Sequence, residues 1–60
     1  MENKIAQFRK KKKLTQQDLS DELNIDRTHL SKVETGMVDP SISLLGRLAE
    51  KLGVSIKDFF

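Results

Sequence analysis

The amino-acid sequence predicts an all-α domain, a compact bundle of five short helices. Apolar residues recur three and four positions apart in several segments, which is the spacing of one helix face. Valine and isoleucine, which favour strands, are sparse beside leucine, and one proline and three glycines leave little material for long loops. Sixty residues without a repeat, linker or low-complexity tract predict a single domain with one small core, over residues 1–60.

The expected helix starts follow from residues that cap helices. Thr15, with Asp18 three positions later, has the pattern of a capping box, and Ser55 with Asp58 repeats it. Ser41 is the expected cap of a further helix. The apolar stripe of that helix is formed by Ile42, Leu45, Leu48, Ala49 and Leu52. We therefore expect helices over about residues 2–12, 16–23, 27–35, 42–52 and 56–59.

The expected turns carry residues that tolerate a positive φ. Asn24 suits a sharp reversal after the second helix, and Gly36 is the expected residue after the end of the third. Asp26 is the expected N-cap of the third helix. Gly46 lies inside the fourth predicted helix, where glycine costs about 1 kcal/mol relative to alanine. It either permits a close helix contact or is simply tolerated, and we favour the second interpretation.

The second and third predicted helices form a recognisable pair. Leu19 and Leu23 lie four positions apart on one helix, and Leu30 and Val33 lie three apart on the next. Ile25 fills the short turn between them. This arrangement describes a helix-turn-helix, in which the second helix can enter the major groove of DNA.

The third predicted helix turns a polar face away from Leu30 when successive residues are placed about 100° apart. This face could donate hydrogen bonds to base edges or phosphates. Its residues are Thr28, Ser31 and Lys32, joined by Arg27, which lies closer to the core side but sits in the first turn, where a long side chain can reach outward. His29 on the flank is interpreted as a solvated or phosphate-contacting side chain. A solvated helix surface would have the same composition, so this pattern alone leaves both interpretations open.

Charge is distributed unevenly within the net +2. Residues 1–13 hold six basic side chains and one acidic one, whereas residues 14–40 hold two basic and six acidic ones. The predicted DNA-reading unit is thus acidic, although nucleic-acid binding favours a basic footprint. The lysines that end the first predicted helix either face phosphates or interact with the helix dipole, and both roles are compatible.

Glu34 falls on the core side of the third predicted helix, within about 60° of Leu30. A carboxylate in that position is costly unless it is paired. Arg9, one residue after the apolar Phe8, is the basic residue in a suitable position. We predict a partly buried Arg9–Glu34 ion pair that holds the first helix against the third.

An enzyme is not expected, and we predict no catalytic residue, metal site, cofactor or small-molecule substrate. The chain has one histidine, no cysteine and no glycine-rich phosphate loop, and His29 has no ligand companion three or four positions away. The lack of cysteine suits a reducing compartment. No apolar run approaches the length of a membrane span, and no signal-peptide pattern is present.

The ordered set of residues, from Ile5 to Phe60, closely resembles the Cro and lambda-repressor-like (Xre-type) helix-turn-helix family. The matching residues are Arg9, Leu14-Thr15-Gln16, Leu19, Leu23, Ile25, Leu30, Ser31, Val33, Glu34, Gly36, Pro40-Ser41, Leu48-Ala49 and Leu52-Gly53-Val54-Ser55. The resemblance implies a five-helix fold and sequence-specific binding of double-stranded DNA, usually by a homodimer on a palindromic operator. It further implies a cytoplasmic transcriptional regulator, most often a repressor.

The resemblance also implies roles for individual residues. Base contacts are expected from Arg27, Thr28, Ser31 and Lys32. Contacts to the DNA backbone are expected from Gln16, His29, Thr35, Gly36 and Lys13. Two residues depart from the family pattern in the helix-turn-helix, because Ser20 stands where the family favours alanine and Asn24 replaces a turn glycine. Serine fits that site sterically and can bond a carbonyl one turn back.

The alternative function is a protein-interaction module on the same fold, with weak or no DNA binding. The acidic middle segment and the pair Phe59-Phe60 motivate it. These two aromatic residues either close the core beneath the first and fourth helices or, if exposed, mark a dimer or partner surface. Their burial discriminates between the two cases.

Overall fold

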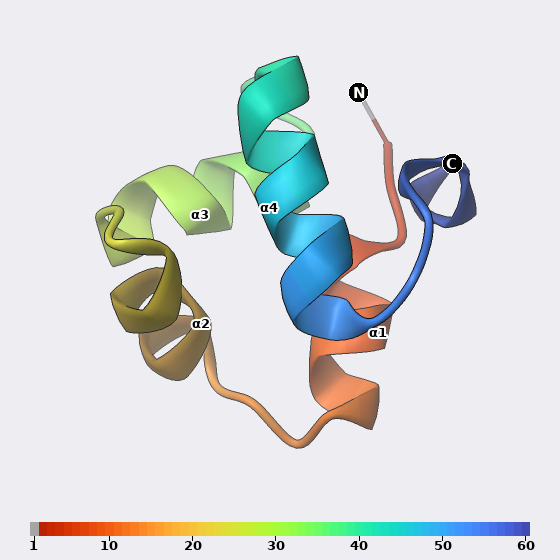
Figure 1. Cartoon of the computed structure of the whole chain (residues 1–60). Coiled ribbons are helices and arrows are strands. Elements are labelled where there is room, and N and C mark those ends of the chain that lie inside the picture. The colour runs from red at the N-terminus through yellow and green to blue at the C-terminus, as the bar shows by residue number, and fades with distance from the viewer. Residues whose placement is uncertain (1) are drawn as a thin grey trace.

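The computed structural model describes residues 2–60, which form four α-helices followed by one short 3-10 helix (Figure 1). The elements are α1 (Ile5–Lys11), α2 (Gln16–Leu23), α3 (Arg27–Glu34), α4 (Ile42–Leu52) and η1 (Ile56–Phe59). No strand occurs among the described residues, so the predicted all-α class is confirmed. The fifth helix is a 3-10 turn because four residues are too few for a run of α-helical hydrogen bonds.

The first helix starts later than expected, at Ile5, because the preceding segment bonds to other parts of the fold. The Lys4 backbone N–H donates to the Phe59 carbonyl at 2.7 Å. Asn3 Oδ1 accepts from the Ile5 N–H at 3.1 Å, and Asn3 Nδ2 donates to the Val33 carbonyl at 2.9 Å. This segment thereby joins the start of α1 to α3 and η1.

Capping side chains determine where α2 and α4 begin. The Thr15 hydroxyl accepts from the Asp18 N–H, and the Asp18 carboxylate accepts from the Thr15 N–H, both at 3.0 Å. Ser41 Oγ accepts from the Leu44 N–H at 3.0 Å. Asp26 occupies the N-cap of α3, but its side chain makes no cap hydrogen bond. Asp26 is the N-cap that the sequence predicts, but its carboxylate is exposed to solvent and is not bonded to the first turn of α3.

Each of the four α-helices is followed by a left-handed residue, which for α4 is Gly53 with φ of 69°. Asn24 and Gly36 have φ of 56° and 82°, as their residue types lead one to expect. Lys13 has φ of 59°, which the sequence does not predict. The N–H groups of Lys13 and Leu14 close the end of α1 by donating to carbonyls in its last turn, at 2.9 and 3.2 Å.

The hydrophobic core takes side chains from all five elements. Its buried members are Ile5, Leu19, Leu23, Leu30, Val33, Leu44, Leu45, Leu48, Ala49, Leu52 and Phe59. Phe59 packs edge-on against Phe8, with ring centroids 6.0 Å apart, and closes the core, whereas Phe60 is 47% exposed.

Ile42 lies outside the core, with 78% of its surface exposed. Its expected place in the apolar stripe of the fourth helix is wrong because it is the first residue of α4, ahead of the turn that reaches the core. Gly46 lies on the outer face of the same helix, and an added Cβ there would have no atom within 4 Å outside the backbone of its own helix. No contact within residues 2–60 requires glycine at this position, which favours the interpretation that it is simply tolerated.

Among residues 2–60, no helix combines the length and the apolar character that crossing a bilayer requires. The same residues contain no cluster of three or more histidine, cysteine, aspartate or glutamate side chains that could hold a metal ion.

Candidate nucleic-acid interface

Helices α2 and α3 pack closely against one another across the tight turn that joins them (Figure 1). Their inward side chains, Leu19, Leu23, Leu30 and Val33, are all buried. Ser20, at the contact between the two helices, is completely buried, and its hydroxyl donates to the Gln17 carbonyl at 2.9 Å. The serine is therefore satisfied within its own helix and does not disturb the pair.

The outward face of α3 collects the residues that the sequence predicts to read bases. Arg27, Thr28 and Lys32 are exposed, and Ser31 is partly buried between them. Within residues 2–60, the side chains of Arg27, Thr28 and Lys32 have no hydrogen-bond or ion-pair partner. Their donor groups are consequently solvated and available to a ligand.

The flanking residues lie at both ends of this face. His29 is exposed beside Thr28 in the first half of α3. Thr35 is exposed just after α3 and its hydroxyl donates to the Lys32 carbonyl at 3.2 Å, which leaves the oxygen able to accept. The next residue, Gly36, has φ of 82° and turns the chain away from the helix end.

The opposite side of α3 carries an ion pair between Arg9 and Glu34. Arg9 Nε donates to Glu34 Oε2 at 2.8 Å and Arg9 Nη2 donates to Glu34 Oε1 at 3.2 Å. The side chains are only 9% and 4% exposed. Arg9 Nη1 donates to the Leu14 carbonyl at 2.7 Å, so the guanidinium also fixes the loop between α1 and α2.

Gln16 joins this ion pair from the first turn of α2. Its Nε2 donates to Glu34 Oε1 at 3.0 Å. The Glu34 carboxylate thus accepts three hydrogen bonds, from residues of α1 and α2. The resemblance that assigns Gln16 to a phosphate does not predict this internal partner, although an amide nitrogen carries a second hydrogen that can donate elsewhere.

Of the four lysines at the end of α1, two lie close to other parts of the fold and two extend into solvent. Lys11 Nζ lies 5.1 Å from the centre of the Phe8 ring, within the range of a cation–π contact. Lys12 Nζ lies beside Gly53, 3.7 Å from the position that a Cβ would occupy, and so approaches the C-terminal end of α4. Lys10 and Lys13 are exposed.

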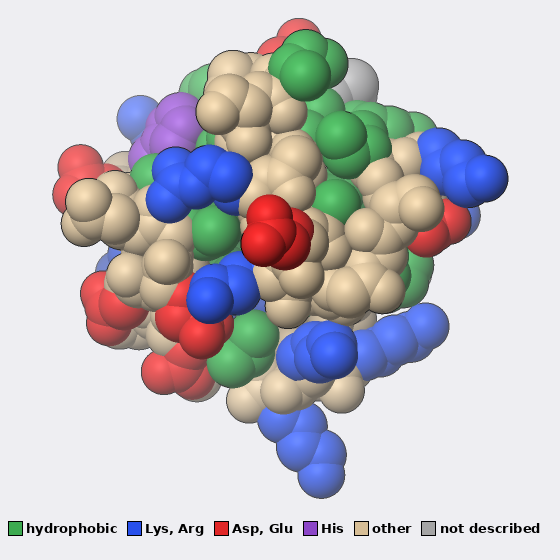
Figure 2. All heavy atoms as spheres, viewed as in Figure 1, with side chains coloured by type: hydrophobic (Ala, Val, Ile, Leu, Met, Phe, Trp, Pro, Cys, Tyr) green, Lys and Arg blue, Asp and Glu red, His purple; other side chains and the backbone are tan. Residues whose placement is uncertain are grey.

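The acidic side chains of α2 find partners, but not among the lysines of α1. Gln17 Nε2 donates to Asp21 Oδ1 at 2.8 Å, and Lys51 of α4 lies 3.7 Å from Glu22. No ion pair within residues 2–60 joins these carboxylates to the lysines of α1. Figure 2 shows acidic side chains gathered over α2 and lysines projecting from α1.

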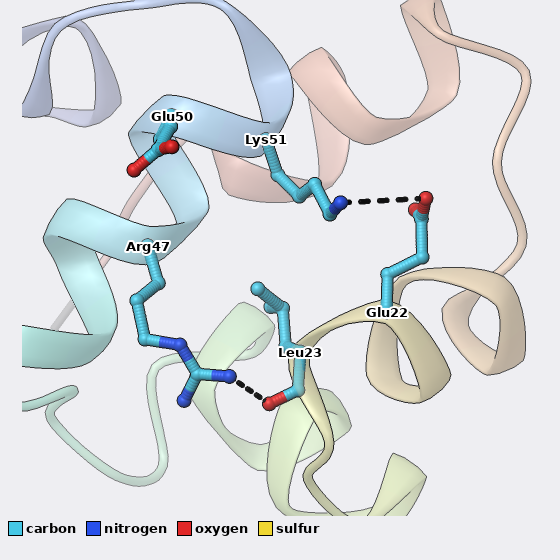
Figure 3. A pocket seen from close by; sticks show the side chains of 5 residues that line it. All are labelled: Glu22, Leu23, Arg47, Glu50 and Lys51. Atoms are coloured by element: carbon cyan, nitrogen blue, oxygen red, sulfur yellow. Dashed lines mark hydrogen bonds and ion pairs between the residues drawn. The ribbon is translucent and has the colours of Figure 1, made fainter.

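A shallow pocket of about 170 Å³ separates α2 from α4. Its lining residues are Glu22, Leu23, Arg47, Glu50 and Lys51 (Figure 3). Arg47 reaches across it and donates to the carbonyl of Leu23 in the last turn of α2. A cation at that helix end is favourable, and the contact anchors the helix pair to α4. Sequence reasoning missed this role of Arg47, whose only signal was an arginine on the polar face of the fourth helix.

Comparison with known proteins places the chain in a helix-turn-helix family. Residues 5–59 match a helix-turn-helix family model. The whole chain is 38% identical to an HTH-type transcriptional regulator of Methanocaldococcus jannaschii, of which it covers 91%. It is 36% identical over 53 residues to the immunity repressor protein of Bacillus phage phi105 and 40% identical over 53 residues to multiprotein-bridging factor 1 of Debaryomyces hansenii.

These two alignments each include 88% of this chain, but they cover only 37% of the repressor and 35% of the bridging factor. The longer relatives thus share one segment with this protein. The family match and the archaeal relative extend over nearly the whole described fold, including both helices of the pair and the polar face of α3. The chain belongs to the helix-turn-helix family.

Proposed function

We propose that this chain binds double-stranded DNA in a sequence-specific manner, with α3 in the major groove. It acts as part of a cytoplasmic transcriptional regulator, and that regulator is a repressor. Two copies bind the halves of a palindromic operator. The names of two relatives, a transcriptional regulator and a phage repressor, support regulation of transcription.

The observation that carries this proposal is the unpartnered polar face of α3. The charged groups of Arg27 and Lys32 are exposed to solvent, whereas the other side of the helix is buried. Such donors can bond guanine or phosphate oxygens without breaking any contact within the described chain. Because one recognition helix reads only about 4–5 base pairs, a specific site requires two copies about one helical turn apart.

Backbone contacts are proposed on either side of this face. Gln16 donates one amide hydrogen to Glu34, and the second is directed to a phosphate. Thr35 and the Gly36 backbone approach a phosphate near the end of α3, and His29 and Lys13 supply further contacts. In this proposal the Arg9–Glu34 pair positions Gln16 and does not itself touch DNA.

A binding selection on randomised duplexes tests the proposal. The recovered pool is titrated by fluorescence anisotropy at several salt concentrations. Enrichment of a short two-fold symmetric sequence, with log K falling linearly against log salt, is the expected result and counts the phosphate contacts. Failure to enrich any sequence, with residual binding lost at modest salt, contradicts it.

A protein-interaction module is the second candidate, and two observations favour it. The exposed surface of α2 is acidic, which is unfavourable near phosphates, and one relative is named a multiprotein-bridging factor. The same selection discriminates between the candidates, because an interaction module enriches no DNA sequence.

A further inference from the structure

The connection between α3 and α4 exposes apolar side chains. Met37 is 76% exposed and Ile42 is 78% exposed, whereas Val38 and Pro40 between them are partly buried. We call these four residues the connection patch. Figure 2 shows hydrophobic side chains at the surface of the molecule where α4 begins. Exposed apolar groups gathered in one short segment mark an interaction surface more often than singly scattered ones do.

The patch is poorly suited to phosphate. Residues 37–46 contain a single charged side chain, Asp39, although 33% of the whole chain is charged. Contacts to a nucleic-acid backbone depend on lysine, arginine and polar donors. The charge distribution therefore favours a protein partner with an equally uncharged surface.

We propose that the connection patch packs against the connection patch of a second copy of this chain, bound to the neighbouring half of the operator. This inference rests on the proposed DNA-binding function. In a two-fold contact each surface meets its own copy, so a surface of one charge repels itself. The acidic face of α2 and the lysines of α1 fail that condition, and the connection patch meets it.

The dimensions of the molecule agree with such a contact. Its Cα atoms span 23 Å in the two longest directions. Side chains add roughly 3 Å on each side, which gives about 30 Å. Half-sites one helical turn apart are separated by about 34–36 Å. The two lengths differ by only about 4–6 Å, so neighbouring copies lie close enough for exposed side chains at their facing edges, such as Met37 and Ile42, to approach one another.

The contact is small. Two exposed side chains per copy bury far less than the ~1,600 Å² of a standard stable interface. We therefore expect the protein to be monomeric in solution. On DNA, adjacent half-sites hold the two patches at an effective concentration on the order of millimolar, so that the same contact produces cooperative binding.

The test uses duplexes that carry one or both half-sites of the selected sequence. The proteins are the wild type, the double variant Met37→Gln with Ile42→Gln, and the control Phe60→Gln, which removes an exposed apolar side chain just after η1. Anisotropy measures affinity and cooperativity, sedimentation measures the oligomeric state, and thermal unfolding shows that each variant folds. All three changes are uncharged and lie on the surface.

The wild type and Phe60→Gln are expected to bind the second half-site about 10-fold more tightly than the first, or about 1.4 kcal/mol. The double variant is expected to lose this factor while it retains the wild-type affinity for a single half-site. Unchanged cooperativity in the double variant would overturn the proposal, and so would a loss of single half-site affinity, which would place the patch on DNA. Absence of cooperativity in the wild type overturns the second-copy contact alone, whereas absence of any specific binding overturns the proposed function as well.

Discussion

Two sets of polar side chains on α3 lie within two turns of one helix and have opposite surroundings. Glu34 is 4% exposed in its side chain and accepts three hydrogen bonds from Arg9 and Gln16. On the other face, Arg27 and Lys32 are exposed and have no partner within residues 2–60. The fold uses the bonding capacity of the first set, and the second set leaves its donors available. Charge alone does not separate the structural residue from the proposed DNA-contacting residues here, but the partners of each charge do.

The largest expected effect follows from breaking the buried set. Arg9→Met leaves the Glu34 carboxylate buried with only Gln16 as a side-chain donor, and losing one partner of a buried pair lowers the free energy of unfolding by about 3–5 kcal/mol. Urea denaturation followed by circular dichroism measures it. Combining Arg9→Met with Glu34→Leu should recover part of the loss. A change below about 1 kcal/mol in Arg9→Met would show that water reaches Glu34.

On the exposed set, Lys32→Ala is expected to weaken binding to the selected DNA sequence by about 1–3 kcal/mol without changing thermal stability. Lys57→Ala, on η1, removes the same charge from an exposed position away from α3 and serves as the control. Anisotropy titrations on selected and scrambled duplexes measure both variants. An equal loss on every duplex would assign Lys32 to a phosphate instead of a base edge.

A substitution that lies outside both sets of side chains should change stability and leave DNA binding unchanged. Gly46→Ala adds a methyl group with no atom within 4 Å and should raise the free energy of unfolding by about 1 kcal/mol, since alanine favours helix. The melting temperature should rise by about 4–8 °C, while affinity for a single half-site stays the same. A lower melting temperature would mean that the outer face of α4 is more crowded than the structure shows.

The smallest expected effect concerns a polar pair that is satisfied but exposed. The Thr15 backbone N–H, and secondarily the Thr15 side chain, lower the pKa of the Asp18 carboxyl from its ordinary value of 3.8. A lowered pKa in the folded state stabilises the protein above the unfolded-state value. That contribution is lost as the pH falls below 3.8 through the folded-state pKa.

Thermal unfolding of the wild type and Asp18→Asn between pH 2 and pH 7, roughly the range over which carboxylates titrate, measures the Asp18 contribution. The difference between the two proteins should shrink at the acidic end, because protonated Asp18 resembles asparagine. If the difference in thermal stability between the wild type and Asp18→Asn did not change with pH, the titration of Asp18 would not contribute to the stability of the protein. Compared with Arg9→Met, the effect should be slight, since exposed charges are screened by water.

Local features of this chain follow from its sequence. The capping box of Thr15 and Asp18, the Ser41 cap and the left-handed Asn24 depend on residues within four positions of one another. The burial of Leu30 and Val33, and hence the outward position of Lys32, follows from helix periodicity. The fold class and the polar face of α3 are predictable for this reason.

Features that depend on distant segments do not follow in the same way. Gln16 has an internal partner eighteen positions away, and Arg47 bonds to a carbonyl on another helix. The late start of α1 depends on a bond between Lys4 and Phe59. Ile42 fits the periodic pattern but lies outside the packed layer. For Gln16, Arg47 and Lys4 the deciding contact is tertiary, and spacing along the chain carries no record of it.

The hydrogen bond between Lys4 and Phe59 has a consequence for the entropy of the unfolded chain. It joins residues fifty-five positions apart at an N···O distance of 2.7 Å, whereas most other backbone bonds of this fold join residues no more than six positions apart. The cost of closing a flexible loop grows only slowly with its length, and the folded chain meets this cost on every folding event. A short peptide linker that joined the segments around Lys4 and Phe59 would meet this cost before folding begins.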